Sequence, residues 1–466
     1  TSQANTTRQA RTRRPRTPGQ IQTDTTDVTT QLLRRWEVRG SLSFNKMRGF
    51  SRLLPIPMRI DQTTMKFNTN DITLTNAHLH LGKSDFMLNG EINRIRQVML
   101  RGGKLRGNFS LTSDYIDCNQ LMKAMNSGMQ YSEQHLATAG QSVMDEESFV
   151  TMDTHTLQDS IATATLDTTD RVFVIPANLD ITLHTNAQKI DFKDAELTNV
   201  LGEVIIRDQS INLSNLKMDS NIGRGNMTMF YTAKDYSGAS AGFDLDMEDV
   251  MVEKLIGLYP AIDTLVPMLR SFEGVVDCQV TATCKMDSTM SLELPSLHSA
   301  CYLHGENMVL LDGETFTEIS KTLMFKNKKR NVIDSISVDL AIKDNKIEVF
   351  PFLVEMDRYK VAVGGTHNLD MTFNYHLSVL KSPVPFKLGI DITGNLDDFK
   401  YKIVKCRYKD LFKPAKEAEL DSTRTNVRKE IRESIRNQIK ETAPELVSSL
   451  SPNHTATPPE GETNAL

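Results

Sequence analysis

The sequence predicts a mostly β protein: an elongated, curved antiparallel sheet with an apolar groove built from repeated hairpins, plus short helices and an amphipathic C-terminal helix. Two observations carry this prediction. Apolar and polar residues alternate over long stretches, most clearly between residues 336 and 379. Two distant segments, 206–213 and 342–349, also share one strand–turn–strand template. A period of two gives each strand one apolar and one polar face.

The alternation between residues 336 and 379 supplies the candidate site. Apolar side chains occupy every second position of two runs, which we take as candidates for lining the groove: Ile336, Val338, Leu340, Ile342, Leu369, Met371, Phe373, Tyr375 and Leu377. An apolar face of this kind either closes against a second sheet or lines a groove that holds an apolar ligand. The pattern alone leaves both alternatives open.

The hairpin template recurs along the chain. Residues 206–213 and 342–349 each read as a strand, a basic–acidic–amide turn and a second strand, and residues 81–86 form a looser relative. Repeated hairpins that bury one face against their neighbours favour an elongated body built by stacking.

Composition shifts divide the chain into six regions. Residues 1–39 are expected to form a disordered basic loop, residues 40–130 a β repeat region, and residues 131–170 a polar insertion. Residues 171–410 are expected to form a C-terminal β region, residues 411–445 an amphipathic helix, and residues 446–466 a disordered tail. Short helices are expected at 118–129 in the first β region and near 250–270 in the second.

The C-terminal helix carries one narrow apolar stripe. Its members recur every four residues: Val427, Ile431, Ile435 and Ile439. Such a stripe suits a helix that covers an open sheet edge, one that packs on a partner, or one that lies on a membrane surface.

Charge and hydropathy exclude two classes. The 466 residues carry a net charge of −5, which argues against a nucleic-acid binder, and no apolar run is long enough to span a membrane. The first residue is Thr rather than Met. We therefore expect a processed chain or a fragment, with any N-terminal anchor outside this sequence.

No catalytic motif stands out. Phosphate-binding loops, dinucleotide fingerprints, nucleophile elbows and zinc-protease helices are missing from the sequence, so we expect no enzyme and no cofactor. The best metal candidates have spacings unlike those of zinc sites: Cys284, His298, Cys301 and His304. His78 and His80 are expected to be solvated or hydrogen-bonded, and the five scattered cysteines to be small buried side chains.

Several blocks resemble the AsmA/TamB-like proteins, particularly the AsmA family of Bacteroides-type bacteria. The first block is residues 74–86, and the second combines residues 334–340, 350–352 and 359–365. The third block, residues 388–399, is similar to the "strand, Gly, x, Leu, x, Asp" ending common in the family. The likeness covers most of residues 40–410 and corresponds to the C-terminal part of such proteins.

This resemblance implies a periplasmic β-sheet with an apolar trough, anchored in the inner membrane of a Gram-negative bacterium by an N-terminal helix that this chain lacks. It also implies a non-enzymatic role in outer-membrane assembly, by shielding or transferring phospholipid acyl chains along a β groove between the two membranes, as bridge-like lipid transfer proteins do. The implied partners are acyl chains, the inner membrane and outer-membrane assembly proteins. The 22 methionines would suit an adaptable apolar lining. The alternative is an envelope scaffold of closed β-sandwiches without lipid transport, and a hydrolase is a third class.

Overall fold

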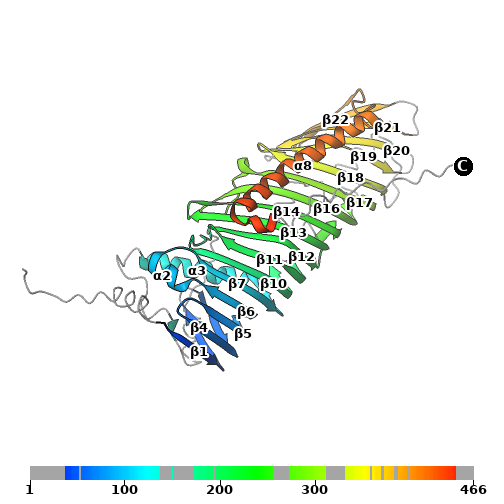
Figure 1. Cartoon of the computed structure of the whole chain (residues 1–466). Coiled ribbons are helices and arrows are strands. Elements are labelled where there is room, and N and C mark those ends of the chain that lie inside the picture. Colours follow the sequence, from blue (N-terminus) through cyan, green and yellow to red (C-terminus); the bar gives the residue numbers. More distant parts are fainter. Residues whose placement is uncertain are drawn as a thin grey trace, which may run out of the picture.

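The computed structural model describes residues 37–51, 54–136, 149–150, 172–192, 195–254, 272–310, 331–356, 359–368, 372–382, 387–395 and 398–447. These residues form one long, open, curved antiparallel sheet with few helices (Figure 1), which confirms the predicted fold class. All the described strands belong to this single sheet. The alternative of closed β-sandwiches, which need two stacked sheets, is therefore wrong.

The first part of the sheet contains β1 (Arg39–Phe44), β2 (Met47–Ser51), β3 (Leu54–Ile60), β4 (Thr63–Asn68), β5 (Ile72–Leu81), β6 (Ser84–Asn93), β7 (Leu105–Ser113), β8 (Ile116–Asp117) and β9 (Phe149–Val150). β1 pairs with β4 and β2 pairs with β3, so these four strands form one long, interrupted hairpin. Two helices follow β6 and β8: α2 (Ile95–Arg101) and α3 (Cys118–Leu136). The helix predicted at 118–129 is therefore present and longer than expected.

The second part of the sheet contains β10 (Leu179–Phe192), β11 (Ala195–Arg207), β12 (Ser210–Ser220), β13 (Arg224–Asp235), β14 (Gly238–Met251), β15 (Phe272–Glu273), β16 (Val275–Asp287), β17 (His298–Leu310), β18 (Asn331–Lys343), β19 (Lys346–Met356), β20 (Tyr359–Asn368), β21 (Phe373–Lys381), β22 (Leu388–Gly394) and β23 (Phe399–Val404). The 3-10 helix η3 (Leu294–Ser296) precedes β17. The chain continues after β23 into α8 (Pro414–Thr442) and α9 (Pro444–Val447).

One junction in the sheet is parallel. β10 pairs in the same direction as β7 and β8, with Leu179 opposite Leu105 and Ile190 opposite Ile116. Parallel neighbours require a crossover rather than a tight turn. This crossover falls at the predicted polar insertion, 131–170, most of which lies outside the described residues.

Two-residue turns join the repeated hairpins. Asp208 and Gln209 have φ of 52° and 60°, and Asp344 and Asn345 have φ of 53° and 61°. Two successive residues with positive φ match a type I′ turn, whose twist suits antiparallel strands and which favours Asn and Asp. The structure thus confirms the hairpin template that the sequence repeats.

Asn and Asp also occupy β-bulges inside the strands. Asn76, Asn199, Asn215 and Asp249 have positive φ and lie where the pairing register shifts. A bulge bends its strand and increases the local twist. These bulges therefore contribute to the curvature of the sheet.

The predictions for the chain ends fall mostly outside the described residues. This applies to the disorder predicted at 1–39 and 446–466 and to most of the helix predicted near 250–270. β1 begins at Arg39 and α9 ends at Val447, just inside the segments predicted to be disordered.

Candidate functional site

One face of the sheet is apolar from its first strand to its last. Residues directly opposite each other on neighbouring strands point to the same side of a sheet. The register therefore defines a row that crosses the sheet, formed by Leu42, Met65, Leu74, Gly90, Phe109, Leu183, Val204, Leu213, Met229, Phe243, Ala282, Ser299, Ile342, Ile347, His367, Phe373, Gly394 and Phe399. Apart from two glycines, a serine and a histidine, every side chain in the row is apolar. We call this side of the sheet the apolar face.

A second row lies on the same face over the later strands. It runs through Met227, Leu245, Val280, Cys301, Leu340, Val349, Gly365, Tyr375, Ile392 and Tyr401. Burial raises the pKa of the Tyr375 hydroxyl to about 12, because the charged form would be poorly solvated among these apolar side chains.

The structure brings the described site candidates onto this apolar face. They are Ile336, Val338, Leu340 and Ile342 on β18 and Phe373, Tyr375 and Leu377 on β21. Val338, Phe373 and Leu377 are half-buried, and the other four are buried. The remaining two candidates, Leu369 and Met371, lie outside the described residues.

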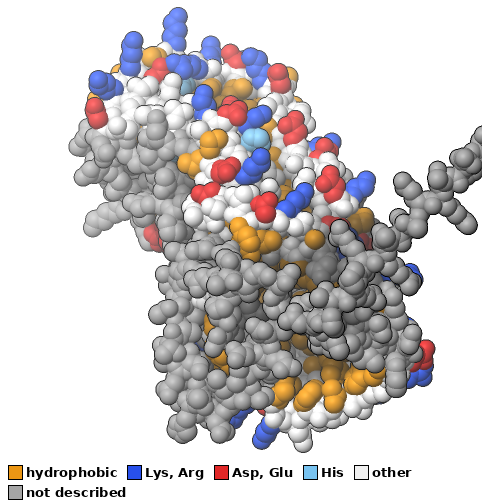
Figure 2. Space-filling view, turned by 90° about the vertical axis from the view of Figure 1, so that its left-hand side faces the viewer, with side chains coloured by type: hydrophobic (Ala, Val, Ile, Leu, Met, Phe, Trp, Pro, Cys, Tyr) orange, Lys and Arg blue, Asp and Glu red, His pale blue; other side chains and the backbone are white. Residues whose placement is uncertain are grey.

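The apolar face is packed in its middle and exposed at its ends. Near the centre, Cys278, Leu303 and Ile336 belong to one buried cluster. On the edge strands, Leu42 of β1 is 44% exposed and Ile403 of β23 is 62% exposed. Figure 2 shows hydrophobic side chains side by side at the lower end of the molecule, over the first strands of the sheet. The apolar face therefore reaches both open edges.

The opposite face is polar, and α8 lies across it (Figure 1). Ile435 and Ile439 are 1% and 0% exposed and pack with Ile205 and Phe230 of the sheet. An α-helix rises about 5.4 Å per turn, close to the roughly 4.8 Å between neighbouring strands. Successive turns of α8 therefore meet successive strands.

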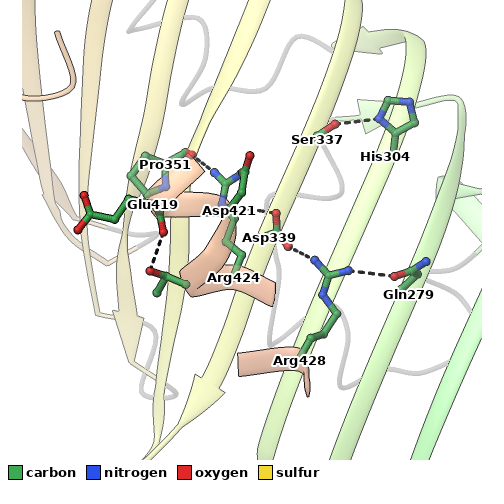
Figure 3. Close-up of polar contacts among 10 residues, drawn as sticks. Gln279, His304, Ser337, Asp339, Pro351, Glu419, Asp421, Arg424 and Arg428 are labelled. Atoms are coloured by element: carbon green, nitrogen blue, oxygen red, sulfur yellow. Dashed lines mark hydrogen bonds and ion pairs between the residues drawn. The ribbon is translucent and has the colours of Figure 1, made fainter. Parts of the chain in front are cut away.

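Three arginines fix the middle part of α8, and Figure 3 shows two of them, Arg424 and Arg428. Arg428 donates to Asp339 Oδ1 at 2.7 Å and to Gln279 Oε1 at 2.9 Å. Arg424 donates to the carbonyl of Pro351, and its Nε lies 3.6 Å from Asp339. One turn beyond Arg428, Arg432 donates to Asp244 at 2.9 Å.

Asp339 is the most buried carboxylate in this contact, with a side chain only 8% exposed. Burial raises the pKa of the Asp339 carboxyl above its usual value, and the two neighbouring arginines only partly oppose this shift. Removing a neighbouring arginine would therefore leave a poorly solvated charge.

The position of α8 corrects one interpretation of its stripe. Ile435 and Ile439 are buried and Val427 and Ile431 half-buried, so the predicted stripe faces the protein. It covers a face of the sheet, so the expectation that it covers a sheet edge is wrong. Because α8 occupies the polar face, it does not cover the apolar face. Among the described residues, Val172 and Ile175 and the start of α3 pack against parts of the apolar face.

A Ser–His–Asp arrangement lies on the polar face near the C-terminal end. His376 Nδ1 is 2.6 Å from Asp391 Oδ1, and His376 Nε2 is 2.9 Å from Ser378 Oγ. These distances match those of a catalytic triad. However, Ser378 is 0% exposed. The backbone N–H of Arg407 donates to His376 Nε2, and the backbone N–H of Tyr408 donates to Ser378 Oγ. In this conformation no substrate carbonyl can reach the serine, and the network fastens residues 407 and 408 to the sheet.

The candidate metal ligands are divided between the two faces. Cys284 and Cys301 belong to a cluster on the apolar face, whereas His304 lies on the polar face, with Nδ1 2.8 Å from Ser337 Oγ. These side chains cannot coordinate one ion. In the other histidine pair, His80 Nε2 lies 3.1 Å from Asp61. All five cysteines are free.

Comparisons with family models, curated proteins and solved structures found no match. The resemblance to the AsmA/TamB-like proteins therefore stays a prediction. Within the described ranges, no helix has the length and apolar character required to cross a membrane.

Proposed function

We propose that this chain is a non-enzymatic protein of the cell envelope that shields or transfers phospholipid acyl chains along the apolar face of its sheet. The observation that carries the proposal is the row of apolar side chains from Leu42 to Phe399, which crosses the sheet and ends at two open edges. An apolar face that served only as a protein core would not need to extend over exposed edge strands.

The physical argument concerns the cost of moving an acyl chain through water. Exposed apolar area costs roughly 25 cal/mol per Å², or about 0.8 kcal/mol for each methylene group. A continuous apolar face removes this cost at every point along it. Because the row presents few polar groups, no position holds the chain strongly, and an acyl chain can slide.

The cellular setting of the proposal comes from the sequence resemblance. It suggests the periplasmic side of the inner membrane of a Gram-negative bacterium, transfer between the inner and outer membranes, and outer-membrane assembly proteins as partners.

Native mass spectrometry with lipid extraction tests the proposal. The full chain is purified from a Gram-negative host, and we expect several phospholipid molecules to accompany each chain. The variant Val338→Asp/Phe373→Asp places two charges on half-buried positions of the apolar face. We expect it to lose the bound lipid while its circular dichroism keeps the β signature.

The matched control is Ser335→Asp/Asn374→Asp, which places the same charges on exposed positions of the polar face of the same two strands. This variant should keep its lipid. If the apolar-face variant unfolds, Leu42→Asp on the exposed edge replaces it, with partial loss of lipid expected. A lipid-free wild-type chain, or equal lipid content in both double variants, would refute the proposal and favour a scaffold role.

A further inference from the structure

The last strand and the segment after it carry a concentration of exposed basic side chains. Residues 398–417 contain seven Lys or Arg and three Asp or Glu, although the net charge of the whole chain is −5. Figure 2 shows Lys and Arg side chains gathered over the upper end of the molecule, where β22 and the start of α8 lie in Figure 1. We call the exposed lysines of this region the basic tip: Lys400, Lys402, Lys405, Lys409, Lys413 and Lys416.

Exposed apolar side chains lie directly beside these lysines. Tyr401 and Ile403 of the edge strand β23 are 50% and 62% exposed and point to the apolar face. Lys400 and Lys402 alternate with them and point to the polar face. β23 thus presents a cationic side and an apolar side along one open edge.

This combination matches the chemistry of a bilayer surface that contains anionic phospholipids. Lysines attract the phosphate groups, and their long side chains let the ammonium groups reach the headgroups while the stems pack on apolar surface. Tyrosine favours the headgroup level, and an aliphatic side chain inserts below it. A nucleic acid would use the same lysines but would gain little from Ile403.

We propose that the C-terminal end of the sheet, formed by β23 and the basic tip, docks on bilayers that contain anionic phospholipids. Docking stands on the charge and exposure of these residues and does not require lipid carriage. Its consequence for transfer rests on the proposed function, because docking through β23 would bring one end of the apolar face to the bilayer.

Co-sedimentation of the full chain with vesicles tests the docking surface. We expect binding to phosphatidylcholine vesicles that contain phosphatidylglycerol, weakened by salt, and little binding to phosphatidylcholine alone. Each lysine near an anionic surface strengthens binding about fivefold, so Lys400→Gln/Lys402→Gln should bind roughly 30-fold more weakly. Tyr401→Ser/Ile403→Ser should also bind more weakly.

The matched control is Lys343→Gln/Lys346→Gln, which removes two exposed lysines from the turn between β18 and β19. It should bind as the wild type does. Equal binding to neutral vesicles, or an equal loss in the control, would overturn the proposal. A third result would also overturn it: vesicle binding by Tyr401→Ser/Ile403→Ser equal to that of the wild type, together with wild-type binding to single-stranded DNA as strong as its binding to vesicles.

The docking and carriage proposals can fail separately. Lys400→Gln/Lys402→Gln should keep the phospholipid that accompanies the purified chain, because it leaves the apolar face unchanged. Bound lipid without vesicle binding would refute docking alone, and vesicle binding by a lipid-free chain would refute carriage alone.

Discussion

The contact between Arg428 and Asp339 makes a sharp prediction about α8. In Arg428→Met, Asp339 loses its 2.7 Å partner, Gln279 loses a donor, and the ring of Tyr302 loses the guanidinium that lies 5.0 Å from its centroid. Methionine keeps most of the side-chain length and the helix propensity. The main change is therefore a buried carboxylate without its closest counter-charge.

The magnitude follows from burial. Breaking a buried ion pair by removing one partner costs about 3–5 kcal/mol. Arg424 remains 3.6 Å from Asp339 and recovers part of this energy. We therefore expect the docking of α8 to weaken by about 2 kcal/mol, which corresponds to roughly 30-fold faster opening of the helix.

Amide hydrogen exchange measures this opening directly. The amides of α8 should exchange about 30-fold faster in Arg428→Met, whereas those of β10 should not change. The matched control is Lys429→Met, which removes the same charge from the next, exposed position of the helix. Adding Asp339→Asn to Arg428→Met should restore most of the protection, because the unpaired charge is then removed. Equal exchange in Arg428→Met and Lys429→Met, or no rescue by Asp339→Asn, would refute this reasoning.

Three further predictions follow from burial, titration and backbone conformation. Ile439→Ala, at a fully buried position, should weaken the docking of α8 by about 2–5 kcal/mol, as measured by amide hydrogen exchange in the helix. The control Val427→Ala, at a half-buried position, should have a much smaller effect in the same measurement. Because burial raises the pKa of Asp339 above 3.8, the folded state binds its proton more readily than the unfolded state does, and the contribution of Asp339 to stability should rise as the pH falls from neutral. In urea unfolding, the free energy of unfolding of the wild type should therefore rise relative to that of Asp339→Asn as the pH falls from neutral; a fall in this difference would contradict the reasoning. Asn345→Val should destabilise the β18–β19 hairpin by roughly 1–2 kcal/mol, because a β-branched residue resists its φ of 61°, whereas Asn345→Gly should be neutral or stabilising in thermal unfolding.

The strands and their faces could be predicted because both signals are local. The alternation from Ile336 to Ile342 fixes which side chains share a face, whatever the strand pairs with. The Asp344–Asn345 turn fixes the register of the next strand. Short segments of the sequence therefore determine which residues form the apolar face.

The position of α8 could not be predicted in the same way. The sheet partners of Arg428 lie 89 and 149 residues before it in the chain. The helix sequence shows a narrow stripe but carries no information about which surface receives it. The contact of His376 with Asp391 and Arg407 was missed for a similar reason, because its members occupy three separate segments.

The parallel junction between β7 and β10 has a consequence for how the chain folds. In the hairpins, paired residues are close in sequence, so each pairing closes a short loop at low entropic cost. Joining Leu105 to Leu179 closes a much longer loop, and such non-local pairings form slowly. We expect β1–β8 and β10–β23 to form as two independent blocks, which then join along a single seam late in folding.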